Sequence, residues 1–160
     1  MDFTAMTQTV FSTAIETPIG PLVLVQQGEG LVRVRWGAVL QDQSTELLDE
    51  AWVQVNDYFA GKRRQFDLPL NYKCKPYQKQ ICEQMLKIPY GETATYGDLA
   101  VATASSAQAV GNACAGNPFP VIVPCHRVLA AQGLGGYSGD GGIETKIALL
   151  KMESSVPWLI

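Results

Sequence analysis

The apolar positions of the first 36 residues follow the pattern of short strands. Residues 9–17, 21–27 and 31–36 form three apolar-rich runs, and the last of them, LVRVRW, alternates apolar and basic side chains. Two glycine-containing turns, TPIG at 17–20 and GEG at 28–30, separate the runs. Alternation with a period of two indicates strands with one buried face. The pattern therefore predicts a small antiparallel meander.

The period changes after residue 44. Ser44 or Thr45 can cap a helix there, and Gly61 can end it. Between these positions large apolar side chains recur at helical intervals, at Leu47, Leu48, Trp52, Val55 and Phe59. The stretch FDLPLNYKCKP, at 66–76, then looks like a connection, which places a boundary between two lobes near residues 70–75.

Three further helices are predicted in the second half. The first runs from Pro76 to Pro89, the second begins with a capping box of Thr95 and Asp98 and ends near residue 103, and the third spans about 105–116. Ser105 or Ser106 caps the third helix, and Gly116 stops it. Two short helices joined by about three residues have the spacing of a helix-turn-helix, although any αα-hairpin has the same spacing.

The third of these helices is unusual in composition. The run AQAVGNACA at 107–115 contains no charged residue, and Gly111 stands in its middle, where glycine costs about 1 kcal/mol relative to alanine. Small side chains allow a helix backbone to approach its neighbour closely. That neighbour is either another helix or a narrow nucleic-acid groove.

Composition limits the class of protein. With 160 residues, 47% hydrophobic and 17% charged, the chain is expected to be globular, as one domain or two small lobes. We expect no secretory signal and no membrane span, because the N-terminus lacks a basic start and no apolar run approaches about 18 residues. The four cysteines form no C-x-x-C pair, so neither a zinc site nor a disulfide framework is predicted, and a reducing cytoplasm is the expected compartment.

Charge is distributed unevenly along the chain. The net charge of −3 argues against a general nucleic-acid binder. Yet seven of the twelve basic residues fall between 62 and 87, against only Asp67 and Glu83. A solvated connector and an exposed helix face account for this distribution without a special function.

The stretch FPVIVPCHRVL, at 119–129, holds the chemistry. It contains His126, the only histidine of the chain, next to Cys125. A thiol and an imidazole are the usual components of a thiolate nucleophile and its base. If the apolar run is a strand, however, the two neighbours point to opposite faces and cannot touch.

The C-terminal half resembles the O6-alkylguanine-DNA alkyltransferase family. The resemblance rests on the motifs YGETATYGDLA, AVGNACAGNP, VIVPCHRVL, GYSGDGGIETK and LLKME, in the family's order over residues 76–153, and on YFAGKRRQFDLPL at 58–70. It implies an α+β (mixed α/β) fold. A small ribonuclease-H-like antiparallel sheet lobe occupies residues 1–72. A helical lobe with a winged-helix-like helix-turn-helix, the alkyltransferase and DNA-binding domain, occupies residues 73–160.

The resemblance also implies roles for individual residues. Cys125 is the alkyl acceptor, and His126 acts on it through a bound water while Glu153 holds the histidine. The base pocket is formed by Tyr96, Asn117, the backbone oxygen of Val128, Tyr137 and Ser138. Without the family, Tyr96 and Tyr137 are interpreted as core aromatics. DNA is contacted by Ala107, Gln108, Gly111 and Arg127.

The function that follows is repair of double-stranded DNA by a monomer that uses no cofactor or metal. A guanine alkylated at O6 is flipped into the pocket, and Cys125 takes the alkyl group irreversibly; O4-alkylthymine is a second possible substrate. The family usually has arginine at the position of Gln108 and often a basic residue at that of Ala115, and GYSGDGG is two residues longer than the shortest family version. Two alternatives are a non-catalytic lesion-binding protein and an unrelated thiol enzyme or redox sensor.

Overall fold

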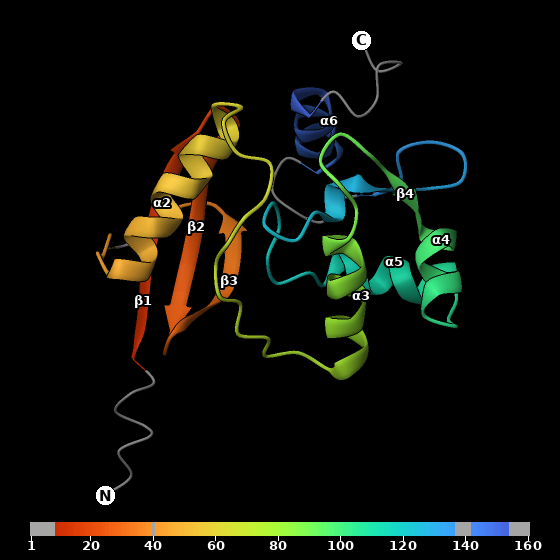
Figure 1. Cartoon of the computed structure of the whole chain (residues 1–160), viewed down its shortest axis with the longest axis horizontal. Helices are drawn as coiled ribbons and strands as arrows, with labels where there is room; N and C mark the ends of the chain where they lie inside the picture. The colour runs from red at the N-terminus through yellow and green to blue at the C-terminus, as the bar shows by residue number, and fades with distance from the viewer. Residues whose placement is uncertain (1–8, 40, 137–141, 154–160) are drawn as a thin grey trace, which may run out of the picture. The chain divides into compact units, whose positions relative to one another are not determined.

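The structure is a computed structural model that describes residues 9–39, 41–136 and 142–153. Its backbone contacts divide the chain into two compact units, residues 1–73 and 74–160. Figure 1 shows a sheet with one helix in the first unit, and helices with short strands in the second. The mixed α and β architecture expected from the sequence is confirmed.

The first unit is built on the predicted meander. Strands β1 (Val10–Thr17), β2 (Gly20–Gln27) and β3 (Gly30–Trp36) pair antiparallel in the order β1-β2-β3. The second hairpin turns at Gly28, whose φ of 64° is a conformation that side-chain-bearing residues rarely adopt. The alternating pattern thus located the strands within about one residue of their observed ends.

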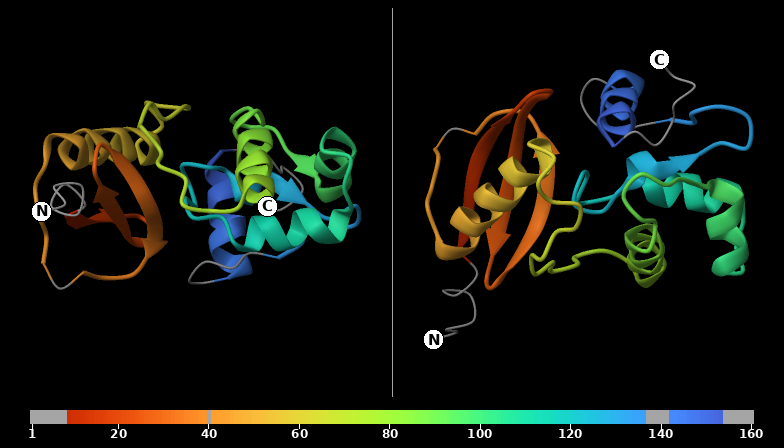
Figure 2. Two further views of the ribbon diagram at one scale, coloured as in Figure 1. Left: turned by 90° about the horizontal axis from the view of Figure 1, so that it is seen from below. Right: turned by 45° about the horizontal axis from the view of Figure 1, so that its top comes forward.

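Helix α2 (Glu46–Phe59) covers one face of this sheet (Figure 2). Thr45 is the cap, and its side chain accepts a hydrogen bond from the backbone N–H of Leu48. The apolar face was predicted partly wrongly. Trp52 is 53% exposed, and the buried stripe consists instead of Leu48, Ala51, Gln54, Val55 and Tyr58. Spacings of three and four residues through Ala51 and Tyr58 define the stripe better than side-chain size does.

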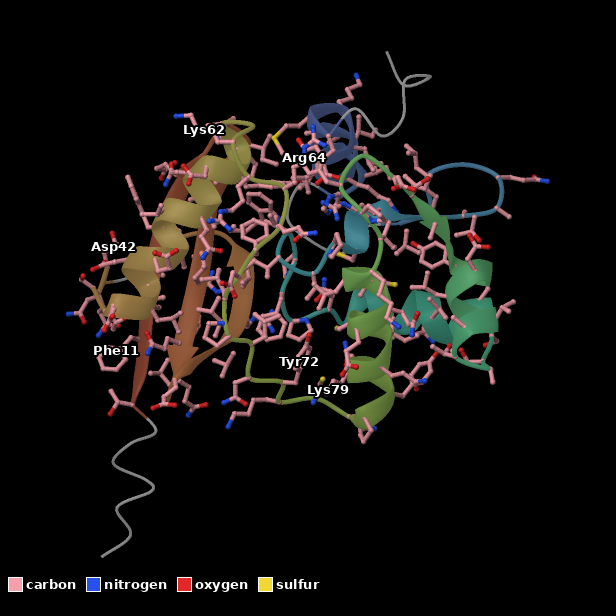
Figure 3. The ribbon with its side chains drawn as sticks, viewed as in Figure 1. Phe11, Asp42, Lys62, Arg64, Tyr72 and Lys79 are labelled. Carbon is pink, nitrogen blue, oxygen red and sulfur yellow. The ribbon has the colours of Figure 1, made fainter. Side chains whose placement is uncertain are left out.

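Both edges of the sheet are occupied. Along β1, Asp42, which is labelled in Figure 3, accepts a hydrogen bond from the backbone N–H of Ala14. The side chain of Gln43 accepts one from the backbone N–H of Ser12. Along β3, the backbone of Leu31 exchanges two hydrogen bonds with the connector, at Pro69 and Asn71. Part of the hydrogen-bonding capacity of both edge strands is therefore used within the first unit.

The second unit is mainly helical. It contains α3 (Pro76–Leu86), β4 (Ala94–Thr95), α4 (Tyr96–Ala102), α5 (Ala107–Ala115), the 3-10 helix η1 (Cys125–Arg127), β5 (Val128–Leu129) and α6 (Ile143–Met152). Parallel pairing of β4 with β5 fixes the end of η1 beside the start of α4. No helix among the described residues is long and apolar enough to cross a membrane.

Helices α4 and α5 form the predicted helix-turn-helix. Thr95 and Asp98 make both hydrogen bonds of a capping box, and the side chain of Ser106 caps α5. Between the helices, Ala104 has a φ of 50°, a left-handed conformation that closes the turn. The hydroxyl of Ser105 bonds to both Thr103 and Tyr77, which ties the turn to the start of α3.

Candidate active site

Cys125 and His126 lie in a turn rather than in a strand. Residues 125–127 form η1, directly after Pro124, and Val121 has a φ of 74°. This left-handed conformation is strained for a β-branched residue and costs on the order of 1–3 kcal/mol. Hydrogen bonds from Val123 N–H to Phe119 O and from Cys125 N–H to Val123 O stabilise the bend. The apolar run was therefore misleading as evidence for a strand, because two backbone reversals interrupt it.

Asn117 braces this bend from the end of α5. Its amide nitrogen donates to Val123 O at 2.9 Å, and its oxygen accepts from the backbone N–H of Phe119 at 2.9 Å. The thiol of Cys82, on α3, approaches the same oxygen at 3.9 Å. One half-buried side chain thus joins two loop positions to a helix terminus, which fits the bracing role that the family resemblance implies.

A buried carboxylate holds His126. Glu153 follows the last residue of α6, and its Oε2 lies 2.9 Å from His126 Nε2. Arg127 binds the same carboxylate through two bonds, Nε to Oε1 at 2.8 Å and Nη2 to Oε2 at 3.0 Å. A third bond joins Arg127 Nη1 to Ile88 O at 2.8 Å. The paired geometry is the strong, orienting form of the arginine–carboxylate contact.

These contacts define the charge and the tautomer of the His126 imidazole. Burial raises the pKa of Glu153, but hydrogen bonds from His126 and Arg127 outweigh burial and hold that pKa at about 2. Burial lowers the pKa of His126, against the partial opposing effect of Glu153, so the imidazole is neutral. An ionised carboxylate only accepts hydrogen bonds, so Nε2 must carry the proton. Nδ1 then presents its lone pair, and this buried atom has no partner among the described residues.

The thiols of this unit differ in what surrounds them. Burial raises the pKa of Cys125, while the Asn117 side chain and Lys146 lower it in part. Burial raises the pKa of Cys82 and that of Cys114 to about 12, which makes both inert as nucleophiles near neutral pH. Lys146 also lowers the pKa of Cys114 in part, so Cys125 differs from the other two buried thiols in having both Asn117 and Lys146 act against burial.

The expected base pocket is described in part. Tyr96 is half-buried at the start of α4, and burial raises the pKa of its phenol. Gly135 lies so close to Tyr96 that a Cβ atom on residue 135 would be 2.8 Å from the Tyr96 ring. The φ of 72° at Gly135 also favours glycine. Val128 is buried in β5. Tyr137 and Ser138 lie outside the described residues.

Sequence reasoning gave no role to Lys146. This lysine of α6 is fully buried, and its Nζ donates to Val128 O at 2.6 Å and to Gly136 O at 3.0 Å. Burial lowers its pKa to about 8. A lysine in a sequence is normally placed on the surface, so the only available signal was its position within GYSGDGGIETK.

The residues expected to contact DNA fall into two groups. Ala107 and Gln108 are exposed on α5, and a Cβ built on Gly111 meets no atom within 4 Å. Packing within the protein therefore does not require glycine at that position. Arg127 requires a correction: its guanidinium is buried and bound to Glu153 and Ile88 O, so it positions the carboxylate and is not available to a phosphate.

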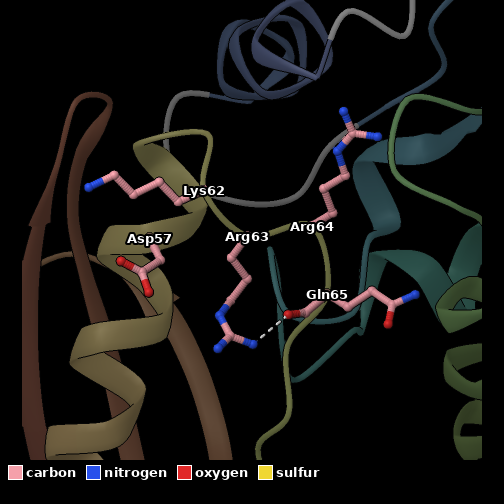
Figure 4. A pocket seen from close by; sticks show the side chains of 5 residues that line it. All are labelled: Asp57, Lys62, Arg63, Arg64 and Gln65. Atoms are coloured by element: carbon pink, nitrogen blue, oxygen red, sulfur yellow. Dashed lines mark hydrogen bonds between the residues drawn. The ribbon is translucent and has the colours of Figure 1, made fainter.

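The basic segment lies mostly at the surface. A shallow hollow at the end of α2 is lined by Asp57, Lys62, Arg63, Arg64 and Gln65, and Arg63 donates to the backbone oxygen of Gln65 at 3.0 Å (Figure 4). This hollow belongs to the first unit. Its residues are not those of the Cys125 site.

Comparison with known proteins agrees with this architecture. Residues 76–155 match the model of the 6-O-methylguanine DNA methyltransferase DNA-binding domain, and residues 10–72 match that of the ribonuclease-like domain of the same proteins. The site of Cys125, His126 and Glu153 lies within the match to the DNA-binding domain, in the unit that contains the helix-turn-helix. The chain belongs to the 6-O-methylguanine DNA methyltransferase family.

Individual relatives are similar over nearly their whole length. The methylated-DNA–protein-cysteine methyltransferase of Mycobacterium bovis is 39% identical, over 88% of this chain and 90% of the relative. The constitutive enzyme of Bacillus subtilis is 37% identical, over 89% and 94%. The crystal structure of the Mycobacterium tuberculosis O6-methylguanine methyltransferase matches with a TM-score of 0.82 at 38% identity, over 92% and 94%. The structure of Mycobacterium tuberculosis OGT in complex with DNA matches with a TM-score of 0.79 at 40% identity, over 91% and 93%.

Within the described ranges, no group of three or more His, Cys, Asp or Glu side chains is arranged to hold a metal ion. The four cysteines are free.

Proposed function

We propose that this protein repairs DNA by transferring the alkyl group of O6-alkylguanine to Cys125, once per molecule. The observation that carries the proposal is the buried thiol of Cys125 next to His126, whose Nε2–H is held by the Glu153 carboxylate. It lies in the part of the chain that matches a DNA-binding domain. A structural cysteine needs no such base beside it.

The reaction balances without a cofactor. His126 Nδ1 takes the thiol proton, through a water, because neighbouring residues of η1 reach each other only indirectly. Sγ attacks the alkyl carbon, the carbon–O6 bond breaks, and its electron pair goes to the purine. The purine takes the proton that Tyr96 donates, and the proton held by His126 returns through water to the Tyr96 oxygen, which leaves guanine and a thioether. Nothing among the proposed groups cleaves a thioether, so the protein is consumed.

The pocket supplies recognition of the flipped base. Tyr96 donates its phenolic proton to the purine as negative charge develops, and the carbonyl of Val128 accepts from the exocyclic amine. The family resemblance assigns further pocket roles to Tyr137 and Ser138, which lie outside the described residues. O4-alkylthymine is a second substrate of the same bond type.

The DNA surface is helix α5. Ala107, Gln108 and Gly111 enter the minor groove, and Gln108 occupies the gap left by the flipped base. We assign the alkyl transfer and the DNA contact to residues 73–160, and a supporting role to residues 1–72. The protein acts as a monomer on double-stranded DNA.

Intact-mass spectrometry after incubation with a duplex containing O6-methylguanine tests the function. The expected result is a permanent increase of one methylene per molecule, located on Cys125, and none in Cys125→Ala. Tight lesion binding without a mass change would indicate a non-catalytic binding protein. A change in mass produced by peroxide, with none produced by the alkylated duplex, would indicate a redox sensor.

A further inference from the structure

Lys146 carries a charge that the reaction proposed above leaves without a role. Its side chain is fully buried, and its ammonium is bonded to two neutral acceptors, Val128 O and Gly136 O. The Tyr96 ring centroid lies 5.8 Å from Nζ. Among the residues that the structure describes, no carboxylate lies within ion-pair distance of Lys146. The site therefore holds a cation without a described anionic partner.

Stability alone does not account for this lysine. Removing an ammonium from water costs several kcal/mol even in relaxed protein environments, and carbonyl dipoles offset only part of that cost. Methionine has a similar length and would fill the same space without a desolvation penalty. A buried, unpaired cation is therefore expected to be retained for what its charge does.

The surrounding groups identify the missing anion. Glu153 is already shared by Arg127 and His126, and His126 is neutral. Titratable groups come from every element around the site: Cys82 of α3, Tyr96 of α4, Cys114 of α5, Cys125, His126 and Arg127 of η1, and Glu153 after α6. Of these, Cys125 is the group that must already be negative when it attacks the alkyl carbon. The negative charge then passes from Sγ to the departing purine.

We propose that Lys146 is a positioning residue whose fixed ammonium, held by the carbonyls of Val128 and Gly136, balances the negative charge that forms on Cys125 and moves to the leaving base. This assignment rests on the proposed function. His126 moves the proton, whereas Lys146 stabilises the resulting negative charge of Cys125 in the buried site. Electrostatic stabilisation by a group already in place requires no reorganisation during the reaction.

The titration behaviour agrees with this role. Burial lowers the pKa of Lys146, and the thiolates of Cys125 and Cys114 would raise it. Reciprocally, Lys146 is among the groups that lower the pKa of Cys125. The two groups stabilise each other's charged forms, as members of an ion pair do.

Two neutral variants separate charge from hydrogen bonding. Lys146→Met removes both, whereas Lys146→Gln retains an amide that can donate to a carbonyl. Lys146→Arg keeps the charge, and Lys151→Met removes an exposed lysine from the same helix as the matched control. Transfer rates are measured between about pH 6 and pH 10 with free O6-benzylguanine, which needs no DNA contact, and thermal melting verifies that each variant is folded.

In both neutral variants the rising limb of the pH–rate profile should shift to higher pH by about one unit. This shift corresponds to about tenfold slower transfer near pH 7. Lys146→Arg should restore most of the rate, and Lys151→Met should match the wild type. A folded Lys146→Gln variant with the wild-type profile would overturn the proposal, because hydrogen bonding would then suffice.

A second measurement does not depend on alkyl transfer. The thiolate absorbance of Cys125, obtained as the difference between each protein and its Cys125→Ser counterpart, gives the thiol pKa directly. It should rise in Lys146→Met and Lys146→Gln. Wild-type protein that takes up no alkyl group would defeat the proposed function, while this titration would still decide the role of Lys146. Asp140 lies outside the described residues; an equal shift in Asp140→Asn would identify that acid as the partner and overturn the assignment.

Discussion

The Cys125 site and helix α5 belong to the same unit and contrast in charge. The site buries Arg127, Lys146 and Glu153 around a thiol and an imidazole. Helix α5, whose Ala107, Gln108 and Ala115 are exposed, contains no charged residue at all. The site thus carries buried charges, which are costly to remove from water, whereas the helix expected to bind a nucleic acid carries none.

This contrast indicates a division of tasks. Buried charges act on a bond because a low-dielectric site strengthens their effect. A neutral helix with small side chains can approach DNA closely, but it does not attract the phosphates. Changes in the site should therefore affect free O6-benzylguanine and duplex substrate alike, whereas changes on α5 should affect the duplex alone.

The largest effect is expected from Cys125→Ala. Transfer should disappear for both substrates, while binding of the alkylated duplex remains, because the thiol is required only for the chemistry. Gel-shift and intact-mass measurements on the same preparation check this. Alkyl uptake at Cys74, Cys82 or Cys114 in the variant would contradict the assignment of the acceptor.

His126→Ala should slow transfer by roughly 10² to 10⁴, the typical range for a lost general base. The defect should shrink as pH rises, because the Cys125 thiol, whose pKa burial raises, then ionises without help. Stopped-time assays with both substrates between neutral and alkaline pH measure the effect. An equally large defect at both ends of the range would mean that His126 only supports the fold of η1.

Glu153→Gln should destabilise the protein by about 3–5 kcal/mol, because it leaves Arg127 buried without its anion. The sign of the pH effect follows from the depressed pKa of Glu153. Its contribution is present above the unfolded value of about 4.3 and is lost as pH falls toward about 2. Denaturant unfolding of both proteins between these pH values should show that the free energy of unfolding falls more steeply with falling pH in the wild type than in the variant. Parallel curves would argue that the carboxylate is not ionised in the folded state.

Alkylation of Cys125 should destabilise the fold by about 1–3 kcal/mol, the usual cost of overpacking a tight site. The added group enlarges a side chain that is only 8% exposed and lies in the bend braced by Asn117. Melting curves before and after reaction with a methyl and a benzyl donor provide the test. The benzyl adduct should lower the midpoint more, and a raised midpoint would contradict this prediction.

The smallest effect concerns Gln108→Arg. A cation on α5 should tighten duplex binding by about two- to fivefold, the equivalent of about 0.5–1 kcal/mol for an exposed cation over aromatic rings. The gain should increase at low salt and leave the reaction with free O6-benzylguanine unchanged. Gln80→Arg, which adds the same charge on the exposed face of α3, is the control. Equal gains in both variants would show that Gln108 has no special position.

The first unit was largely predictable, because its strands and helix follow local periodicity. The three strands required only spacing and residue type, and so did the capping box at Thr95 in the second unit. Trp52 was misplaced because size was weighted above the three-to-four-residue spacing of the buried stripe. Val121, whose left-handed backbone bends the chain before Cys125, carries no local signal, since valine is a poor choice for that conformation.

The site was predictable only in part. Cys125 and His126 stand together in the sequence, but the role of Glu153 came from family resemblance, because 27 positions separate it from His126. Arg127 and Lys146 were not predicted as positioning groups. Their acceptors, Glu153 and the carbonyls of Ile88, Val128 and Gly136, are brought together by the packing of α3 and α6 on η1.

The burial of the thiols has a consequence for how the protein survives in a damaged cell. Free alkylating agents attack exposed, ionised thiols first. Cys82 and Cys114 are protonated at any physiological pH, and Cys125 ionises only with the help of its neighbours. The burial of Cys125 and its raised pKa are therefore expected to slow attack on the acceptor by the same chemicals that create lesions. The thiol of a molecule that acts once therefore reacts mainly with an alkylated base bound in the pocket. The number of alkylated molecules then equals the number of lesions removed.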